Sequence, residues 1–268
     1  MTGQRWVVVS AWRGAILLFL LLVWELGTRV PWLVAHTFLD PFFVSRPSAI
    51  AIRLWQWMSA RGPESLWPHL AATLWATFLG FLVGVGTGFL AGLYLSQNRL
   101  VAVVLRPFIV ALNSLPRIAL VPLITMLFGL GLMSKIVTAW FIVFFVVFFN
   151  TFKGGLAIEA DLLAFCRTLG GTERQITRTV RVPNALAWTF ASLPNAISFS
   201  LIGVVISEFV GSSTGLGYIM IVSLATLNAT DMFVALVVLG GLGVVLVFVI
   251  EGVERRLLHW TPEFQSRV

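Results

Sequence analysis

Charge, cysteine and histidine are scarce in this sequence of 268 residues, and each scarcity excludes a class of protein. Charged residues make up 11% of the chain and hydrophobic residues 59%, with a mean hydropathy of +0.96. A soluble domain needs far more polar surface, so the composition predicts an integral membrane protein. The single cysteine, Cys166, excludes a disulfide within the chain. No metal site is expected, because the histidines lack metal-ligand spacing: His36, His69 and His259.

Signatures of nucleotide binding and hydrolysis are also missing or incomplete. No G-x-x-x-x-G-K-[S/T] segment is present, so the chain shows no phosphate-binding loop and no cofactor is expected. Residues 211–215, Gly-Ser-Ser-Thr-Gly, satisfy the G-x-S-x-G pattern of serine hydrolases. That pattern needs a strand–turn–helix, and an intramembrane serine protease needs a histidine that the last apolar run lacks. A flexible outer loop is the favoured interpretation, and the chain is not expected to be an enzyme.

Six continuous apolar runs are long enough to cross a membrane. A helix needs about 20 apolar residues to span the hydrocarbon, and continuous rather than alternating hydrophobicity argues against transmembrane strands. The sequence therefore predicts an all-α membrane protein with six transmembrane helices. The predicted spans are Gly14–Trp32, His69–Leu95, Phe108–Leu127, Ile136–Phe152, Ala187–Val210 and Met232–Ile250. The first is interpreted as a retained anchor, because no clear cleavage site marks it as a signal peptide.

Basic residues predict the orientation of these spans. They are scattered among the spans instead of clustered on one face, so membrane orientation explains the net charge of +7 better than nucleic-acid binding does. One set of loops and ends contains twelve basic residues, and the opposite set contains five: Arg29, Arg46, Arg53, Arg61 and Lys135. Since basic residues favour the cytoplasmic side, both termini are predicted to be cytoplasmic.

Two shorter apolar segments lie on the predicted outer side. Ser48–Ala60 fits a short helix at the membrane surface, and Ile219–Leu227 fits a re-entrant or interfacial helix because it is too short to cross. The second span carries a stripe of glycines at four-residue spacing: Gly80, Gly84, Gly88 and Gly92. Such a stripe lets another helix approach closely, either as tight static packing or as a seam that moves.

A polar segment interrupts the apolar sequence between Lys153 and Asn184, on the predicted cytoplasmic side. Within it, Leu163–Leu169 can form a short helix that ends at Gly170-Gly171, because glycine commonly terminates helices. A folded polar loop in such a hydrophobic chain either caps the helix bundle or contacts another molecule.

A second helix is predicted to follow this turn. Thr172 and Gln175 have the spacing of a capping box, so the helix begins at Glu173. It runs to about Arg181 and ends against Pro183, because proline has no backbone N–H group. The two helices would form a compact helix–turn–helix.

The polar segment resembles the EAA loop of ABC-importer permease subunits, E-A-A-x3-G-x9-I-x-L-P. Gly170 is followed at the family's spacing by Val180, Val182 and Pro183. Residues 164–166, Ala-Phe-Cys, stand where the family has Glu-Ala-Ala, so the acidic position is lost. Valine replaces the isoleucine and the leucine, which is a conservative change.

Further stretches narrow the resemblance to permeases of the nitrate, sulfonate and taurine type. They are Arg46-Pro47-Ser48-Ala49-Ile50, residues 114–123 with 128–131, and Ser207-Glu208 with Gly215-Leu216-Gly217-Tyr218. The resemblance runs over about residues 40–264. It implies one transmembrane permease domain over residues 1–268, with a cytoplasmic coupling loop at about 153–186, in a bacterial inner membrane.

The resemblance also implies the partners of a type I importer. These are a second permease copy, two cytoplasmic ATPase subunits and an external solute-binding protein, in a membrane and without nucleic acid. The residues that would serve ATPase coupling are Ala164, Arg167, Gly170, Gly171, Thr172, Arg174 and Pro183. The competing class is a self-contained channel or secondary transporter, which would be expected to carry paired ionisable groups or inverted repeats in its spans. No repeat is evident.

Polar residues in the third and fifth spans predict the translocation route and an outer gate. The candidates are Asn113, Ser114, Arg117, Asn195, Ser198 and Glu208. These side chains either line the route or hydrogen-bond between helices. A buried carboxylate needs a partner, and Arg117 is the candidate unless Glu208 faces outer water. The substrate stays open, because the resemblance includes importers of sulfonates, nitrate, bicarbonate, aromatic acids, pyrimidines and riboflavin.

Overall fold

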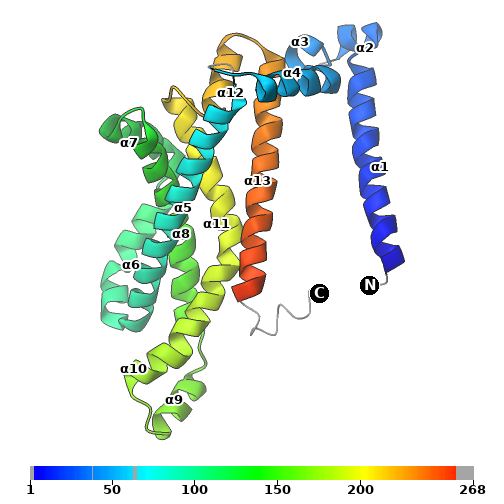
Figure 1. The fold of residues 1–268 in the computed structure, drawn as a ribbon. Helices are drawn as coiled ribbons and strands as arrows, with labels where there is room; N and C mark the ends of the chain where they lie inside the picture. Colours follow the sequence, from blue (N-terminus) through cyan, green and yellow to red (C-terminus); the bar gives the residue numbers. More distant parts are fainter. Residues whose placement is uncertain (1–2, 38, 63–64, 258–268) are drawn as a thin grey trace. The chain divides into compact units, whose positions relative to one another are not determined.

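The computed structural model describes residues 3–37, 39–62 and 65–257, and every regular element in these ranges is helical (Figure 1). The chain divides into two compact units, Met1–His69 with Ile219–Leu239 and Leu70–Tyr218 with Gly240–Val268. The α-helices are α1 (Gly3–Gly27), α2 (Pro31–His36), α3 (Pro41–Val44), α4 (Pro47–Ser59), α5 (Leu66–Gln97), α6 (Arg99–Ser114), α7 (Val121–Phe128), α8 (Leu132–Leu156), α9 (Ala160–Thr168), α10 (Glu173–Ile176), α11 (Val182–Val210), α12 (Leu216–Ala225) and α13 (Ala229–Leu257).

Within the described ranges, five helices are long and apolar enough to cross a membrane. They are Val7–Gly27 within α1, α5, α8, the helix Glu173–Val210 that contains α10 and α11, and α13. The pair Leu100–Ser114 and Arg117–Phe128, which is bent by 82°, makes a sixth if it counts as one broken span. The prediction of an all-helical membrane protein is therefore confirmed, with five or six candidate spans.

The third predicted span, Phe108–Leu127, is wrong as a continuous helix. α6 ends at Ser114, a 3-10 turn occupies Arg117–Leu120, and α7 begins at Val121. Pro116 precedes the 3-10 turn with extended backbone (φ −67°, ψ 100°). It cannot donate a helical hydrogen bond and disfavours helical backbone in the residue before it, so the helix stops there.

In the first unit, polar contacts hold the short helix α4 to two neighbours. Arg53 donates to the carboxylate of Asp231 at 2.6 and 3.1 Å, which ties α4 to the first turns of α13. Glu25 of α1 accepts hydrogen bonds from the backbone N–H and the hydroxyl of Ser48, at 3.0 and 2.9 Å. The helix predicted at Ser48–Ala60 is confirmed as α4.

In the second unit, the glycine stripe of α5 packs directly on α8. A Cβ on Gly84 would lie 2.6 Å from Val143 Cγ1, and a Cβ on Gly88 would lie 2.8 Å from the Phe144 carbonyl oxygen. No side chain separates the two backbones, so the predicted close helix approach is confirmed. The adjoining core joins α5, α8 and α11 through Phe81, Val143, Val147, Leu193, Ala196 and Ile197.

The helix that begins at Glu173 does not end at Pro183, so that prediction is wrong. A π-helical turn at Thr177–Arg181 links α10 to α11, and the Val182 N–H donates to the Thr177 carbonyl five residues earlier. A proline ring inside a regular helix crowds the carbonyl four residues before it, and the wider π turn relieves that contact. Figure 1 shows α9 and α10 together at one end of this unit's long helices.

Candidate functional site

The turn between α9 and α10 has the geometry that its glycines predict. Gly170 has a φ of +82°, in the left-handed region that favours glycine. A Cβ on Gly171 would lie 2.8 Å from the Cys166 carbonyl oxygen, so this position is crowded as well. The predicted capping box is confirmed, because Thr172 Oγ1 accepts from the Gln175 N–H at 3.3 Å while the Thr172 N–H donates to Gln175 Oε1 at 2.9 Å.

Ion pairs and one buried side chain hold the helix pair in shape. Arg167 Nε donates to Glu173 Oε1 at 2.8 Å, and Arg181 Nη2 lies 3.4 Å from Glu173 Oε2. Glu173 sits at the polar end of a 38-residue helix, beyond the roughly 20 residues that a membrane covers. The hydrogen bond and the charge of Arg167 lower the pKa of Glu173 below its ordinary value. The Arg167–Glu173 ion pair is exposed and therefore weak. Ile176, in contrast, is 2% exposed and anchors α10.

Apolar side chains stand exposed on α9 and at its C-cap, within the otherwise polar segment. Leu162 is 45% exposed, Phe165 59% and Leu169 71%. Their spacing of three and four residues places them along one side of the helix. The candidate coupling residues Ala164, Arg167 and Arg174 are also exposed. Exposed apolar groups on a polar loop are typical of a surface that docks on a partner.

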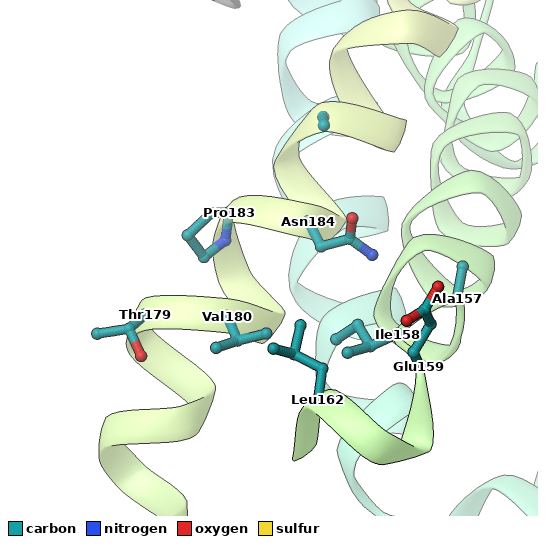
Figure 2. Close-up of a pocket in the computed structure, with 9 residues that line it drawn as sticks. Ala157, Ile158, Glu159, Leu162, Thr179, Val180, Pro183 and Asn184 are labelled. Carbon is teal, nitrogen blue, oxygen red and sulfur yellow. The ribbon is translucent and has the colours of Figure 1, made fainter. Parts of the chain in front are cut away.

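A cavity of about 470 Å³ lies at the base of the helix pair (Figure 2). It opens between the segment that follows α8 and the π-helical turn with the start of α11. Figure 2 shows Leu162 pointing between Ile158 and Val180. Asn184 fixes one wall, because its Nδ2 donates to the Gly154 carbonyl at 2.6 Å. The lining residues are Ala157, Ile158, Glu159, Leu162, Thr179, Val180, Pro183, Asn184 and Ala187.

At the other end of α11, Glu208 forms a buried ion pair with Lys135 of α8. Their Nζ–Oε1 distance is 3.1 Å, and the two side chains are 0% and 2% exposed. Thr73 of α5 donates to the carboxylate at 2.9 Å, and the Gly217 N–H donates to it at 2.8 Å. The partner is therefore Lys135 and not Arg117, and Glu208 does not face water. Lys135 also donates to the Thr214 carbonyl at 2.6 Å, so the pair joins three helices to the segment after α11.

The glycines after α11 are fitted around this carboxylate. Gly215 has a φ of +123°, and a Cβ there would overlap the carboxylate of Glu208. A Cβ on Gly217 would lie 2.8 Å from the Val205 carbonyl oxygen. The G-x-S-x-G segment, expected to be a flexible loop, therefore packs closely on α11. The Thr73 hydroxyl links the same segment to α5 by accepting from the Leu216 N–H at 2.9 Å.

The remaining candidate route residues are only partly brought together. Arg117 donates through Nη2 to Asn113 Oδ1 across one turn at the end of α6. Ser114 and Ser198 each donate to a carbonyl of their own helix, at 2.8 and 3.0 Å. Asn195 is exposed on α11. Their place on a translocation route therefore stays a prediction.

Residues 84–259 match the protein family described as "Binding-protein-dependent transport system inner membrane component". The chain belongs to this family. A probable ABC transporter permease protein of Haemophilus influenzae is 33% identical over 239 residues, which are 89% of this chain and 93% of the relative. The riboflavin transport system permease protein RibX of Chloroflexus aurantiacus is 30% identical over 91% of this chain and 88% of its own. The taurine transport system permease protein TauC of Escherichia coli is 28% identical over 87% and 86%.

A solved structure agrees with this assignment. The MetNI methionine ABC transporter, in an inward-facing conformation, contains a chain with a TM-score of 0.55 and 26% identity, matched over 72% of this permease and 93% of that chain. The protein is thus a permease subunit of an ABC importer, and the resemblance to the sulfonate and taurine permeases is confirmed. It is a multi-pass protein of the bacterial inner membrane and a transport component, with ATP hydrolysis left to partner ATPases.

Sequence reasoning missed three features of the permease. Lys135 belongs to the outer set of basic residues by sequence, although it lies in the first turn of α8 and is buried. Thr73 carries no signal, because threonine in an apolar helix usually bonds to its own backbone. The exposed Leu162, Phe165 and Leu169 could have been found from their helical spacing inside a polar segment.

Proposed function

We propose that this permease forms one half of the translocation unit of a type I importer, working with a second copy, two ATPase subunits and an external solute-binding protein. Six spans, including the broken pair α6–α7, would place both termini in the cytoplasm as one permease domain surrounded by lipid. The twelve-to-five distribution of basic residues supports this orientation. The family's description, which names a binding protein and the inner membrane, supports the partners.

The observation that carries the proposal is the helix pair α9–α10 at one end of the second unit. Its exposed Leu162, Phe165 and Leu169 form an apolar surface, and the cavity beside it offers a concave apolar wall for a partner's side chain. Both favour docking on another protein over a mere cap of the bundle. We assign this partner as the ATPase subunit, with Arg167 and Arg174 as charged contacts at the edge.

One continuous helix connects the proposed docking loop to the buried ion pair. Glu173–Val210 has 38 residues and carries the capping box at its first turn and Glu208 near its last. At 1.5 Å per residue it covers roughly 55 Å. A movement imposed on α10 by the ATPase would therefore reach the segment packed on Glu208 along one helix, through its π-helical turn and past Pro194. A stiff element with two arrangements is what transmission between distant sites requires.

The Gly170 turn tests the docking assignment. Gly170→Val places a β-branched side chain at positive φ and at the tip of the pair, so we expect weaker ATPase co-purification and ATP hydrolysis that no longer drives uptake. Gly129→Val is a matched control, because Gly129 has a φ of +81° and, like Gly170, has open space where a Cβ would lie. Membrane insertion is measured for both. Normal co-purification and uptake for Gly170→Val would show that the turn is not the docking point.

The proposed substrate is a small anion of the sulfonate, nitrate or taurine kind. A positively charged Arg117 within a broken span supports an anion. The alternatives are an aromatic acid or a vitamin precursor, since one similar permease is named for riboflavin and another for formylaminopyrimidine. The ligand of the binding protein encoded beside the permease decides between them.

A further inference from the structure

Arg117 occupies the break between α6 and α7. It is the first residue of the 3-10 turn Arg117–Leu120, where the chain bends by 82°. Its guanidinium carbon lies 5.3 Å from the centroid of the Phe145 ring, and its Nη2 donates to Asn113. The side chain is thus held at two points, one on α8 and one on α6. A guanidinium held in this way is preorganised to bind a ligand, whereas a free arginine side chain samples many rotamers.

Contact with Phe145 places this charge beside the middle of α8, one of the helices long and apolar enough to cross a membrane. α8 runs over Leu132–Leu156, and Phe145 lies near its middle, roughly 17–20 Å along the axis from either end. A cation at that depth is unfavourable unless it meets an opposite charge, water or a polar ligand. The ring face offsets only part of the loss of hydration.

The part of the chain that the structure describes provides no opposite charge for Arg117. The buried Lys135 and Glu208 satisfy each other, and no carboxylate lies within ion-pair distance of Arg117 in residues 3–37, 39–62 and 65–257. Asn113 is neutral. The Nε–H of Arg117 is buried and has no hydrogen-bond acceptor among these residues. Arg117 therefore retains both an uncompensated charge and an unused donor.

We propose that Arg117 binds the anionic group of the transported solute, a carboxylate, sulfonate or phosphate, midway through the membrane. The proposal rests on the function proposed above and names the chemistry of its substrate. Asn113 is a positioning residue that holds the guanidinium through Nη2 and leaves Nε for the ligand. The interrupted helix suits this role, because a chain break within a span is tolerated where it lines a cavity.

The single cysteine makes a charge-selective labelling experiment possible. Ser114→Cys is introduced three residues from Arg117, with Cys166→Ser, in the complete transporter reconstituted in nanodiscs of zwitterionic lipid. Two methanethiosulfonate reagents of similar size are compared, one ending in a sulfonate and one in a trimethylammonium group. We expect the ratio of their rates, relative to a free thiol, to favour the anion by about tenfold or more, because an unpaired cation attracts anions strongly at low dielectric.

Two Arg117 variants and one control complete the design. Arg117→Gln should return the rate ratio to that of a free thiol, whereas Arg117→Lys should preserve the preference for the anion. The control is the protein whose single cysteine is the native Cys166. There, the ratio of the two labelling rates should not change on Arg117→Gln. ATPase co-purification and ATP-dependent uptake are measured on the same preparations, so that failure of the permease function is seen separately.

Several results would overturn the assignment. If both reagents fail to react at residue 114 in every nucleotide state, no aqueous ligand reaches Arg117. An unchanged ratio in Arg117→Gln would show that its charge is neutralised, for example by a carboxylate of the second copy. If phosphatidylglycerol in the nanodisc abolishes the preference for the anion, the guanidinium serves a lipid phosphate instead. With coupled uptake intact, each of these results removes this inference alone.

Discussion

Glu208 is an acidic side chain whose environment supplies every hydrogen bond it needs. It accepts from Lys135, Thr73 and the backbone of Gly217, and it has no exposed surface. Such a pair contributes little net stability compared with apolar residues, because desolvation of both charges offsets their attraction. Its value here is positional, since it fixes the segment after α11 against α5 and α8.

Removing one partner of this pair should be far more harmful than removing both. Lys135→Met or Glu208→Gln leaves the other residue without its buried partner, and loss of one partner typically costs about 3–5 kcal/mol. The double variant should recover much of that loss. Thermal unfolding in nanodiscs, followed by tryptophan fluorescence, measures the coupling. Additive effects of the two substitutions would contradict the pairing.

Glu208→Gln should also impair uptake while the ATPase still co-purifies, and a fully active variant would remove Glu208 from the proposed gate.

The seam between α5 and α8 depends on the absence of side chains at particular positions. A Cβ on Gly88 would meet backbone of α8, which cannot move aside as a flexible side-chain end could. Gly86, on the same helix, has open space where its Cβ would lie. The two glycines are two residues apart and so face different directions on the helix.

This difference yields a matched pair of substitutions. Gly88→Ala should destabilise the permease by about 1–3 kcal/mol, the range typical of overpacking a tight contact. Gly86→Ala should be neutral or slightly stabilising, because alanine favours helix more than glycine does. The midpoints of thermal unfolding for the two variants provide the comparison. Equal midpoints would mean that α5 and α8 do not pack through the stripe.

Local sequence patterns predict most elements and few of the contacts between them. Continuous apolar runs mark five spans well, and the capping box at Thr172 marks the start of α10, because both are local features. The break at Pro116 is harder to predict, since a proline alone does not say whether a span bends or stops. The pairing of Lys135 with Glu208 joins residues 73 positions apart, and no local signal specifies it. Continuation of the helix past Pro183 depends on a π turn that sequence patterns do not reveal.

At the scale of the whole molecule, the second unit has two distinct features at the opposite ends of one long helix. The helix pair α9–α10 carries the exposed apolar side chains of the proposed docking surface, and the Lys135–Glu208 pair lies where the helix ends. Between them α11 packs along α8 through a continuous apolar core. This arrangement supports a division of labour in which ATP is hydrolysed by a partner and the permease converts the resulting movement into a change at its gate.

Contact between the helix pair and an ATPase subunit is the central claim, and the native Cys166 allows a direct test. Benzophenone maleimide attached to Cys166, in the purified complex, should form a photo-cross-link to the ATPase subunit, with a yield that changes on ATP binding. The matched control carries Ser59→Cys with Cys166→Ser, and should give no ATPase adduct because α4 is expected on the outer face. A complex that co-purifies intact but yields no ATPase adduct from Cys166 would contradict the assignment of the coupling loop.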